Sequence, residues 1–120
     1  MYRFCRMIYD RGAWAGSRIL SPEAVDRMTT TQTGTLMVTP PNDAWGYGFG
    51  WLTRRREERR NDPVSLGAFG AGGAYNCGMW INRHRGVMAV WMVQQAGFAE
   101  PERNRVRTAF TDAAVARFGN

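Results

Sequence analysis

Three segments of the chain carry their apolar residues at the spacing of an amphipathic helix. Residues 2–10 form the first of them, and Gly12 follows as a stop. The stretch "LSPEAVDRMTT" predicts the second helix, because Ser21 can cap it and Pro22 suits a first helical position, where a missing N–H costs nothing. Residues 101–118 predict the third helix, with arginines opposite its apolar stripe. That stripe consists of Val106, Ala109, Phe110, Ala113, Ala114 and Phe118.

The middle of the chain changes to the period of a β-strand. "WGYGFGWLT" alternates strictly and predicts one strand with bare glycines on its second face. Its aromatic face consists of Trp45, Tyr47, Phe49 and Trp51. "VSLGAFG" predicts the returning strand, and "NCGMWIN" with "GVMAVWMVQQ" predicts an antiparallel hairpin in which Gly86 takes a positive φ. The unbroken apolar run of residues 87–93 predicts a strand covered on both faces, in the middle of a sheet.

These elements predict an α+β fold with helices on the faces of an antiparallel sheet of three to four strands. Residues 29–43 have little periodicity and indicate a long connection, while residues 54–63 indicate a polar loop. The length of 120 residues and the hydrophobic content of 44% suit one domain.

Charge narrows the classes of function. All sixteen cations are arginines, so no lysine is present to form a Schiff base, act as a general base or bind a phosphate in a P-loop. The net charge of +6 allows a nucleic-acid-binding module as one reading. The run "RRREERRNDP" contains five arginines against three acidic residues and no aromatic residue between them. This composition favours a solvated loop over a nucleic-acid surface.

The chain taken alone lacks the parts of an obvious active site. No nucleophile motif surrounds Ser17, Ser21 or Ser65. The single histidine, His84, stands between two arginines in a predicted turn and is expected to be exposed. The two cysteines, at positions 5 and 77, are expected to be buried thiols, because they lie far apart with no motif for metal or redox chemistry. The expectation is therefore no metal and no cofactor.

The N-terminus offers no core of a signal peptide, because Arg3, Arg6 and Arg11 interrupt its apolar residues. No stretch approaches the roughly 20 apolar residues of a membrane span, so no membrane partner is expected. The sequence therefore assigns the protein to no particular cellular compartment.

Four stretches in order resemble the C-terminal part of the serine beta-lactamase-like family: "ILSPEAVDRMTT", "GYGFGW", "FGAGGAYNCGMWIN" and "RGVMAVWMVQ". This family includes class C beta-lactamases, DD-peptidases similar to penicillin-binding proteins, and esterases. The resemblance spans nearly all of residues 1–120 and implies a partial beta-lactamase/transpeptidase-like fold without its N-terminal, nucleophile-bearing part. Complete members of the family are often exported.

The resemblance also implies roles for particular residues. The family's third active-site motif, Lys-Thr-Gly or His-x-Gly, falls on Ala71, Gly72 and Gly73, so these positions and Tyr75 are the implied substrate-binding residues. Ala71 can supply neither the cation nor the proton carrier of that motif. The position after the motif, Ala74, is the implied backbone donor of the oxyanion hole, and a backbone donor survives side-chain substitution.

Two further motifs of the family, Ser-x-x-Lys and Tyr-x-Asn, are absent from the chain. The leading hypothesis is therefore a C-terminal segment of a serine hydrolase that acts on an amide, lactam or ester in the complete fold and is inactive alone. A second hypothesis is a non-catalytic interaction protein that dimerises, or pairs with the missing N-terminal half, through an incomplete sheet. A basic nucleic-acid-binding module is the third.

Overall fold

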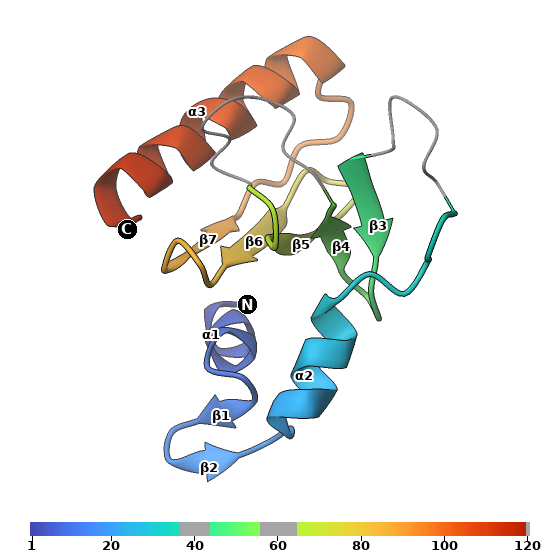
Figure 1. Cartoon of the computed structure of the whole chain (residues 1–120). Helices are drawn as coiled ribbons and strands as arrows, with labels where there is room; N and C mark the ends of the chain where they lie inside the picture. Colours follow the sequence, from blue (N-terminus) through green and yellow to red (C-terminus); the bar gives the residue numbers. More distant parts are fainter. Residues whose placement is uncertain (37–43, 56–64, 120) are drawn as a thin grey trace.

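The computed structural model describes residues 1–36, 44–55 and 65–119, which form an α+β fold (Figure 1). The elements in chain order are α1 (Tyr2–Tyr9), β1 (Ala13–Trp14), β2 (Ser17–Arg18), α2 (Pro22–Thr29), β3 (Trp45–Tyr47), β4 (Leu52–Arg54), β5 (Phe69–Gly72), β6 (Gly78–Asn82), β7 (Val87–Trp91) and α3 (Glu100–Phe118). Strands β1 and β2 form a small hairpin, and β3 to β7 form an antiparallel sheet of five strands in sequential order.

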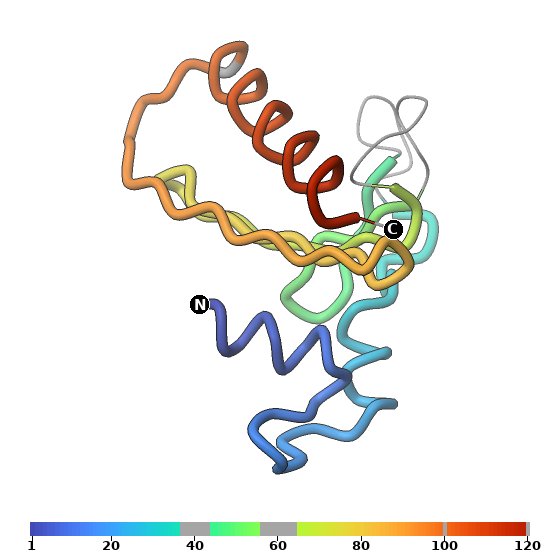
Figure 2. The backbone as a smooth tube through the Cα atoms, turned by 90° about the vertical axis from the view of Figure 1, so that its left-hand side faces the viewer, coloured from blue at the N-terminus to red at the C-terminus, as the bar shows by residue number. Residues whose placement is uncertain are grey.

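The sheet lies between two helical layers. Helix α3 crosses one face, which we call the α3 face, and α1 with α2 lies against the other, which we call the α1 face (Figures 1 and 2). The core on the α1 face contains Cys5, Met7, Ile8, Val25, Trp51, Phe69 and Ile81. The core on the α3 face contains Trp80, Val87 and Ala89, with Phe110, Ala114 and Val115 of the helix packed against them. The predicted fold class is therefore confirmed.

Local signals set several of the boundaries. The Ser21 hydroxyl accepts a hydrogen bond from the Ala24 amide at 3.1 Å, with Pro22 in the first helical turn, so α2 begins where the sequence predicted. Gly12, in the turn that follows α1, has a φ of 92°, and Gly86 takes a φ of 65° in the β6–β7 turn. These positions suit glycine because other residues rarely adopt such φ values.

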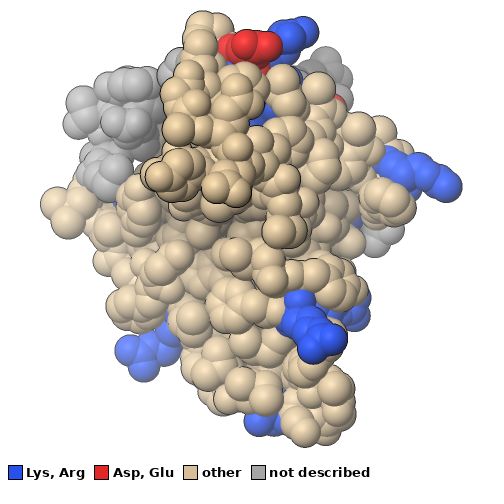
Figure 3. Space-filling view, turned by 180° about the vertical axis from the view of Figure 1, so that it is seen from behind, with Lys and Arg blue, Asp and Glu red and all other residues tan. Residues whose placement is uncertain are grey.

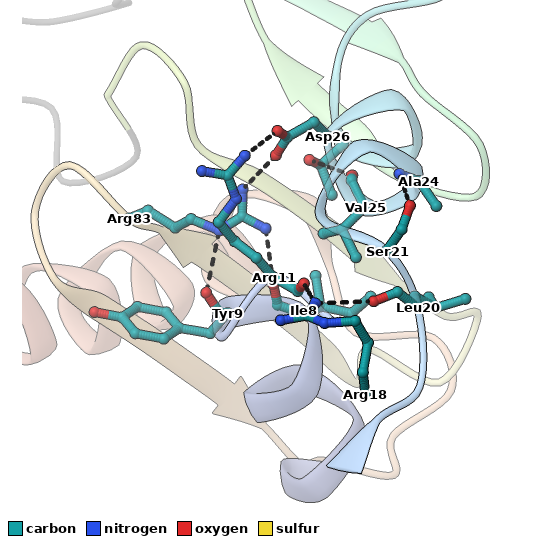
Figure 4. Close-up of polar contacts among 11 residues, drawn as sticks. Ile8, Tyr9, Arg11, Arg18, Leu20, Ser21, Ala24, Val25, Asp26 and Arg83 are labelled. Atoms are coloured by element: carbon teal, nitrogen blue, oxygen red, sulfur yellow. Dashed lines mark hydrogen bonds and ion pairs between the residues drawn. The ribbon is translucent and has the colours of Figure 1, made fainter. Parts of the chain in front are cut away.

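Arg83 ties three segments together (Figure 4). Its guanidinium donates hydrogen bonds to the carbonyl oxygens of Ile8 at 2.7 Å and Tyr9 at 3.2 Å, at the C-terminal end of α1. It also lies 3.5 Å from a carboxylate oxygen of Asp26 on α2, which pairs with Arg11 as well. A cation therefore satisfies the last carbonyls of α1 and holds the β6–β7 turn against both helices.

The prediction of a single strand over "WGYGFGWLT" is wrong, because the chain reverses within it. Strands β3 and β4 pair with each other, and the Gly48 amide donates to the Trp51 carbonyl at 2.8 Å across the turn. Gly50 permits the reversal with a φ of 80°. Trp51 consequently joins the core on the α1 face, whereas Trp45 pairs across the strands with Arg54 on the α3 face. This hairpin raises the sheet from the predicted three to four strands to five.

The returning strand also begins later than predicted. Residues 65–68 form a turn in which the Ala68 amide donates to the Ser65 carbonyl at 3.0 Å, and Gly67 has a φ of 81°. Strand β5 therefore starts at Phe69 and contains the glycine-rich stretch itself. Val64 lies outside the described residues, as do residues 37–43 of the predicted connection and residues 56–63 of the predicted polar loop.

The position predicted for the apolar run of residues 87–93 is wrong as well. Strand β7 ends at Trp91 and forms an edge of the described sheet, not its middle. Its apolar character has another cause: α1 and α3 cover its two faces.

The predicted stripe of the C-terminal helix is only partly correct. Phe110, Ala114 and Val115 pack on the sheet, whereas Phe118 is 70% exposed and Ala109 and Ala113 face away. On the side of α3 that faces the sheet, the Phe110 ring meets that of Trp91 edge-on, with 5.1 Å between the ring centres.

Candidate functional site

The residues implied by the third motif lie at the end of β5 and in the turn that follows. Ala71 pairs with Met79 and Gly72 with Gly78 across the β5–β6 ladder. Beyond the ladder, the Gly73 amide donates to the Cys77 carbonyl at 3.0 Å and closes the turn. Residues 71–75 thus run without interruption from the end of β5 into the turn before β6.

The segment that follows β7 fixes this turn. The Gln95 amide donates to the Tyr75 carbonyl at 3.1 Å, and the Asn76 side-chain amide donates to the Gln95 carbonyl at 2.5 Å. Asn76 holds a φ of 65°, which asparagine tolerates better than most residues. Between these anchors lies Ala74, an exposed residue whose amide donates no hydrogen bond to any described residue. A backbone donor is therefore held in place and open to an acceptor.

The side chain of Ala71 belongs to the α1 face. Paired residues of an antiparallel ladder share a face, and Met79, the partner of Ala71, packs against the core on the α1 side. Phe69, two residues earlier in the strand, is in the same core. A lysine or histidine at position 71 would therefore project on the side of the sheet opposite α3.

A cleft of about 770 Å³ lies on the other face, between α3 and the sheet. We call it the α3 cleft. Gly70, Gly72 and Gly78 lie on the α3 face of their strands, and all three line the cleft without filling it. Its walls and roof carry Trp45, Leu52, Arg54, Trp80, Trp91, Arg103, Asn104, Arg107, Thr108, Phe110 and Thr111. Residues implied by the third motif border the same cleft, together with their neighbours: Phe69, Ala71, Gly73, Ala74, Asn76, Cys77 and Met79.

Arg54 contradicts the prediction that the whole arginine-rich run is a solvated loop. It is 4% exposed, and its guanidinium lies 4.3 Å from the centre of the Trp45 ring. The reason is that Arg54 belongs to β4 and points under α3, where a cation stacked on an indole is stabilised.

The other candidate residues lie outside this region. His84 is exposed in the β6–β7 turn, as predicted, at the end of β6 remote from the Gly72–Gly78 pair. Ser65 is buried and accepts a hydrogen bond from Asn82 at 2.7 Å. Cys5 is buried as predicted, but the prediction for Cys77 is wrong, because it lies exposed in the turn after β5.

Nothing among the described residues assembles three or more potential metal ligands. No helix within the described part of the chain is both long and apolar enough to span a bilayer. Arginine side chains lie apart from one another on the face seen in Figure 3, which does not favour a nucleic-acid surface there.

Sequence reasoning missed the α3 side of the site. Trp80, Trp91 and Arg107 line the cleft, and none was a candidate. One signal was present, since Gly70 and Gly72 alternate along β5 and therefore leave one face of that strand bare. The sequence did not show which face this was or what covered it.

Three comparisons with known proteins bear on this arrangement. A sequence model of the Beta-lactamase family matches residues 1–113. No curated protein matches the chain.

Similar solved structures include unliganded simvastatin synthase (LovD) from Aspergillus terreus, with 16% identity and a TM-score of 0.74 over 96% of this chain and 33% of that one. The LovD6 mutant has 17% identity and a TM-score of 0.74 over 96% and 32% of the two chains. A protein assigned as a beta-lactamase from Bacteroides dorei DSM 17855 has 21% identity and a TM-score of 0.63 over 96% and 38%. The chain thus spans about a third of the length of the structures it resembles, and at these identities they show the fold alone.

Because the Beta-lactamase model covers residues 1–113, nearly the whole chain, the chain belongs to the beta-lactamase family.

Proposed function

We propose that this chain is the C-terminal part of an acyl-transfer serine hydrolase and supplies one wall of its active site. The complete reaction transfers an acyl group from an amide, lactam or ester to a serine and then hydrolyses the acyl-serine. Family membership supports the reaction class, and the missing Ser-x-x-Lys motif means that the nucleophile and base come from another part of the fold.

The observation that carries this proposal is the Ala74 amide. A donor that catalyses acyl transfer must be oriented before the reaction and must have no competing acceptor. The Ala74 amide meets both conditions, because the turn around it is anchored to Gln95 and the amide has no acceptor among the described residues. In the complete site it donates to the substrate carbonyl oxygen as negative charge develops there. Gly72 and Gly73 leave the backbone accessible to the acyl group.

Ala71 limits what this wall can do. Its methyl group cannot carry a proton or pair with a carboxylate, so the chain contributes an oxyanion donor but no acid or base at that position. The chain alone is therefore expected to be inactive.

A fluorophosphonate probe and a p-nitrophenyl ester test the proposal. The purified chain should form no adduct with the probe and should not hydrolyse the ester above background. Co-expressed with the polypeptide encoded immediately upstream, it should permit labelling of a serine in that polypeptide. Labelling of this chain alone, or an upstream sequence without Ser-x-x-Lys, would contradict the proposal.

In the reconstituted protein, Ala71→His should raise the rate of ester hydrolysis by about tenfold or more, because a general acid–base contributes roughly 10²–10⁴-fold when well placed. Ala109→His, on an exposed position of α3, is the control. If neither substitution changed the rate, the alignment of Ala71 with the motif would be wrong.

A second candidate is an interaction protein without catalysis. Strand β7 is an edge of the described sheet, and its sequence, "VMAVW", has no charge or proline to discourage pairing. Apolar side chains are also exposed on α1, where Tyr2 is 57% and Phe4 43% exposed, and just after β7, where Met92 is 79% exposed. This candidate predicts that the chain self-associates or pairs with the missing half, whereas a stable monomer in light scattering would argue against it.

A further inference from the structure

The α3 cleft has aromatic walls whose polar atoms lack partners. Trp80 and Trp91 line it from neighbouring strands, and Phe110 lies against Trp91 from α3. Trp80 is only 9% exposed, and the Nε1–H groups of both indoles are buried without a hydrogen-bond acceptor among the described residues. Buried indole N–H groups are usually paired, so two unpaired ones beside a cavity indicate room for an acceptor.

The described lining of the same cleft is basic. It includes Arg54, Arg103 and Arg107, and no aspartate or glutamate is among the described residues that line it. No hydrogen bond or ion pair joins the Arg107 guanidinium to a described residue. Arg107 is an exposed residue, but partial burial of its guanidinium lowers its pKa, and the like charge of Arg103 lowers it further. An anion in the cleft would favour the charged guanidinium and so oppose both effects.

The size of the cleft suits a small molecule. Its volume of about 770 Å³ falls within the roughly 300–1,000 Å³ of typical ligand sites, which combine apolar walls with a few polar groups. The glycine floor provides the depth. A Cβ added at Gly72 would meet only the Cys77 carbonyl, at 3.4 Å, so packing alone does not require glycine there.

We propose that the α3 cleft binds a small amphipathic monoanion, with a flat aromatic body between the indoles and the glycine floor and a carboxylate directed at Arg107. This site goes beyond the proposed acyl transfer and does not depend on it. The cleft adjoins the wall proposed for acyl transfer, because Gly72, Gly73 and Ala74 also line it, but the Ala71 side chain projects from the opposite face of the sheet and binding of an anion requires no serine.

Titration of the ¹⁵N-labelled chain with 2-naphthoate tests the proposal. The chain has five tryptophans, whose indole N–H signals report separately. Those of Trp80 and Trp91 should shift with a saturable dependence on naphthoate, while that of Trp14, in the β1–β2 hairpin, should not. The uncharged analogue 2-naphthalenemethanol should bind about tenfold more weakly or worse, because it lacks the charge-assisted hydrogen bonds.

Two substitutions locate the site. Gly72→Leu fills the floor and should abolish the shifts, and Arg107→Gln should weaken naphthoate binding about tenfold while leaving naphthalenemethanol unaffected. Arg105→Gln is the matched control, since Arg105 is exposed on the same helix and does not line the cleft.

If the spectrum of Gly72→Leu lost the dispersion of a folded chain, that variant would be unfolded. The difference in naphthoate affinity between Arg107→Gln and Arg105→Gln would then test the site. The proposal is overturned if naphthoate shifts neither indole, or if the two arginine variants bind it equally. Failure of serine labelling would leave these titrations unchanged, so the two proposals fail separately.

Discussion

Arg83 connects more parts of the fold than any sequence pattern indicated. Its side chain is 25% exposed, and its guanidinium serves two carbonyls of α1 and the Asp26 carboxylate while lying 5.1 Å from the Phe69 ring centre. Arg83→Met keeps the aliphatic bulk but loses these bonds, so it should lower the free energy of unfolding by about 2 kcal/mol, since hydrogen bonds to charged groups contribute roughly 1.5–3 kcal/mol. Urea denaturation measures this change.

The control for Arg83 is Arg85→Met, which removes the same charge from the same turn. No hydrogen bond or ion pair of the Arg85 side chain to a described residue is present, so the loss should stay below about 0.5 kcal/mol. Equal losses for the two variants would show that charge, not the contacts of Arg83, matters.

The two cysteines should differ in reactivity. Burial raises the pKa of the Cys5 thiol, so its reactive thiolate is scarce at any given pH, and the side chain is 0% exposed. Cys77 is exposed. Ellman's reagent at pH 8 should therefore titrate one thiol in the native chain and two in urea, and Cys77→Ser should remove the fast one. A fast reaction that persists in Cys77→Ser would contradict the burial of Cys5.

Strand β5 requires glycine at one of its two glycine positions. A Cβ at Gly70 would lie 2.4 Å from the Met79 carbonyl oxygen in the neighbouring strand, too close for any real contact. Gly70→Ala should therefore cost about 1–3 kcal/mol of unfolding free energy, the usual range for overpacking. Gly72→Ala, in the same strand, should be neutral or slightly stabilising. Thermal unfolding of the two variants measures the difference, and similar melting temperatures would mean that the β5–β6 register is wrong.

Self-association of the molecule, if it proceeds through β7 and the exposed apolar side chains, should respond to salt in a particular direction. Each chain carries a net charge of +6, so two copies repel one another at low ionic strength. Screening weakens this repulsion while apolar contacts persist. Light scattering after size exclusion should therefore show a larger mass at about 0.5 M than at 0.05 M salt, where the Debye length exceeds roughly 10 Å. Dissociation at high salt would indicate an ionic interface instead.

The helices and the β6–β7 hairpin were predictable because their signals act over a few residues. Ser21 and Pro22 start α2, and Gly86 turns the hairpin, whatever the rest of the chain does. The reversal inside "WGYGFGWLT" was missed because strict alternation does not distinguish one long strand from two short ones joined at Gly50. The candidate site was predicted only in part, since residues 71–75 came from a resemblance and the α3 cleft from no sequence signal that named its walls.

The amino-acid pattern thus sufficed for the kinds of elements, their order, the α+β class and the family, because hydrophobic period, caps and turn glycines are local properties and the family's stretches follow one another along the chain. The three-dimensional packing decided which strand lies at the edge, that Arg54 is buried on Trp45, and that the bare face of β5 opens under α3 rather than toward α1. These features depend on cross-strand register and on side chains from distant segments, so no local pattern contains them.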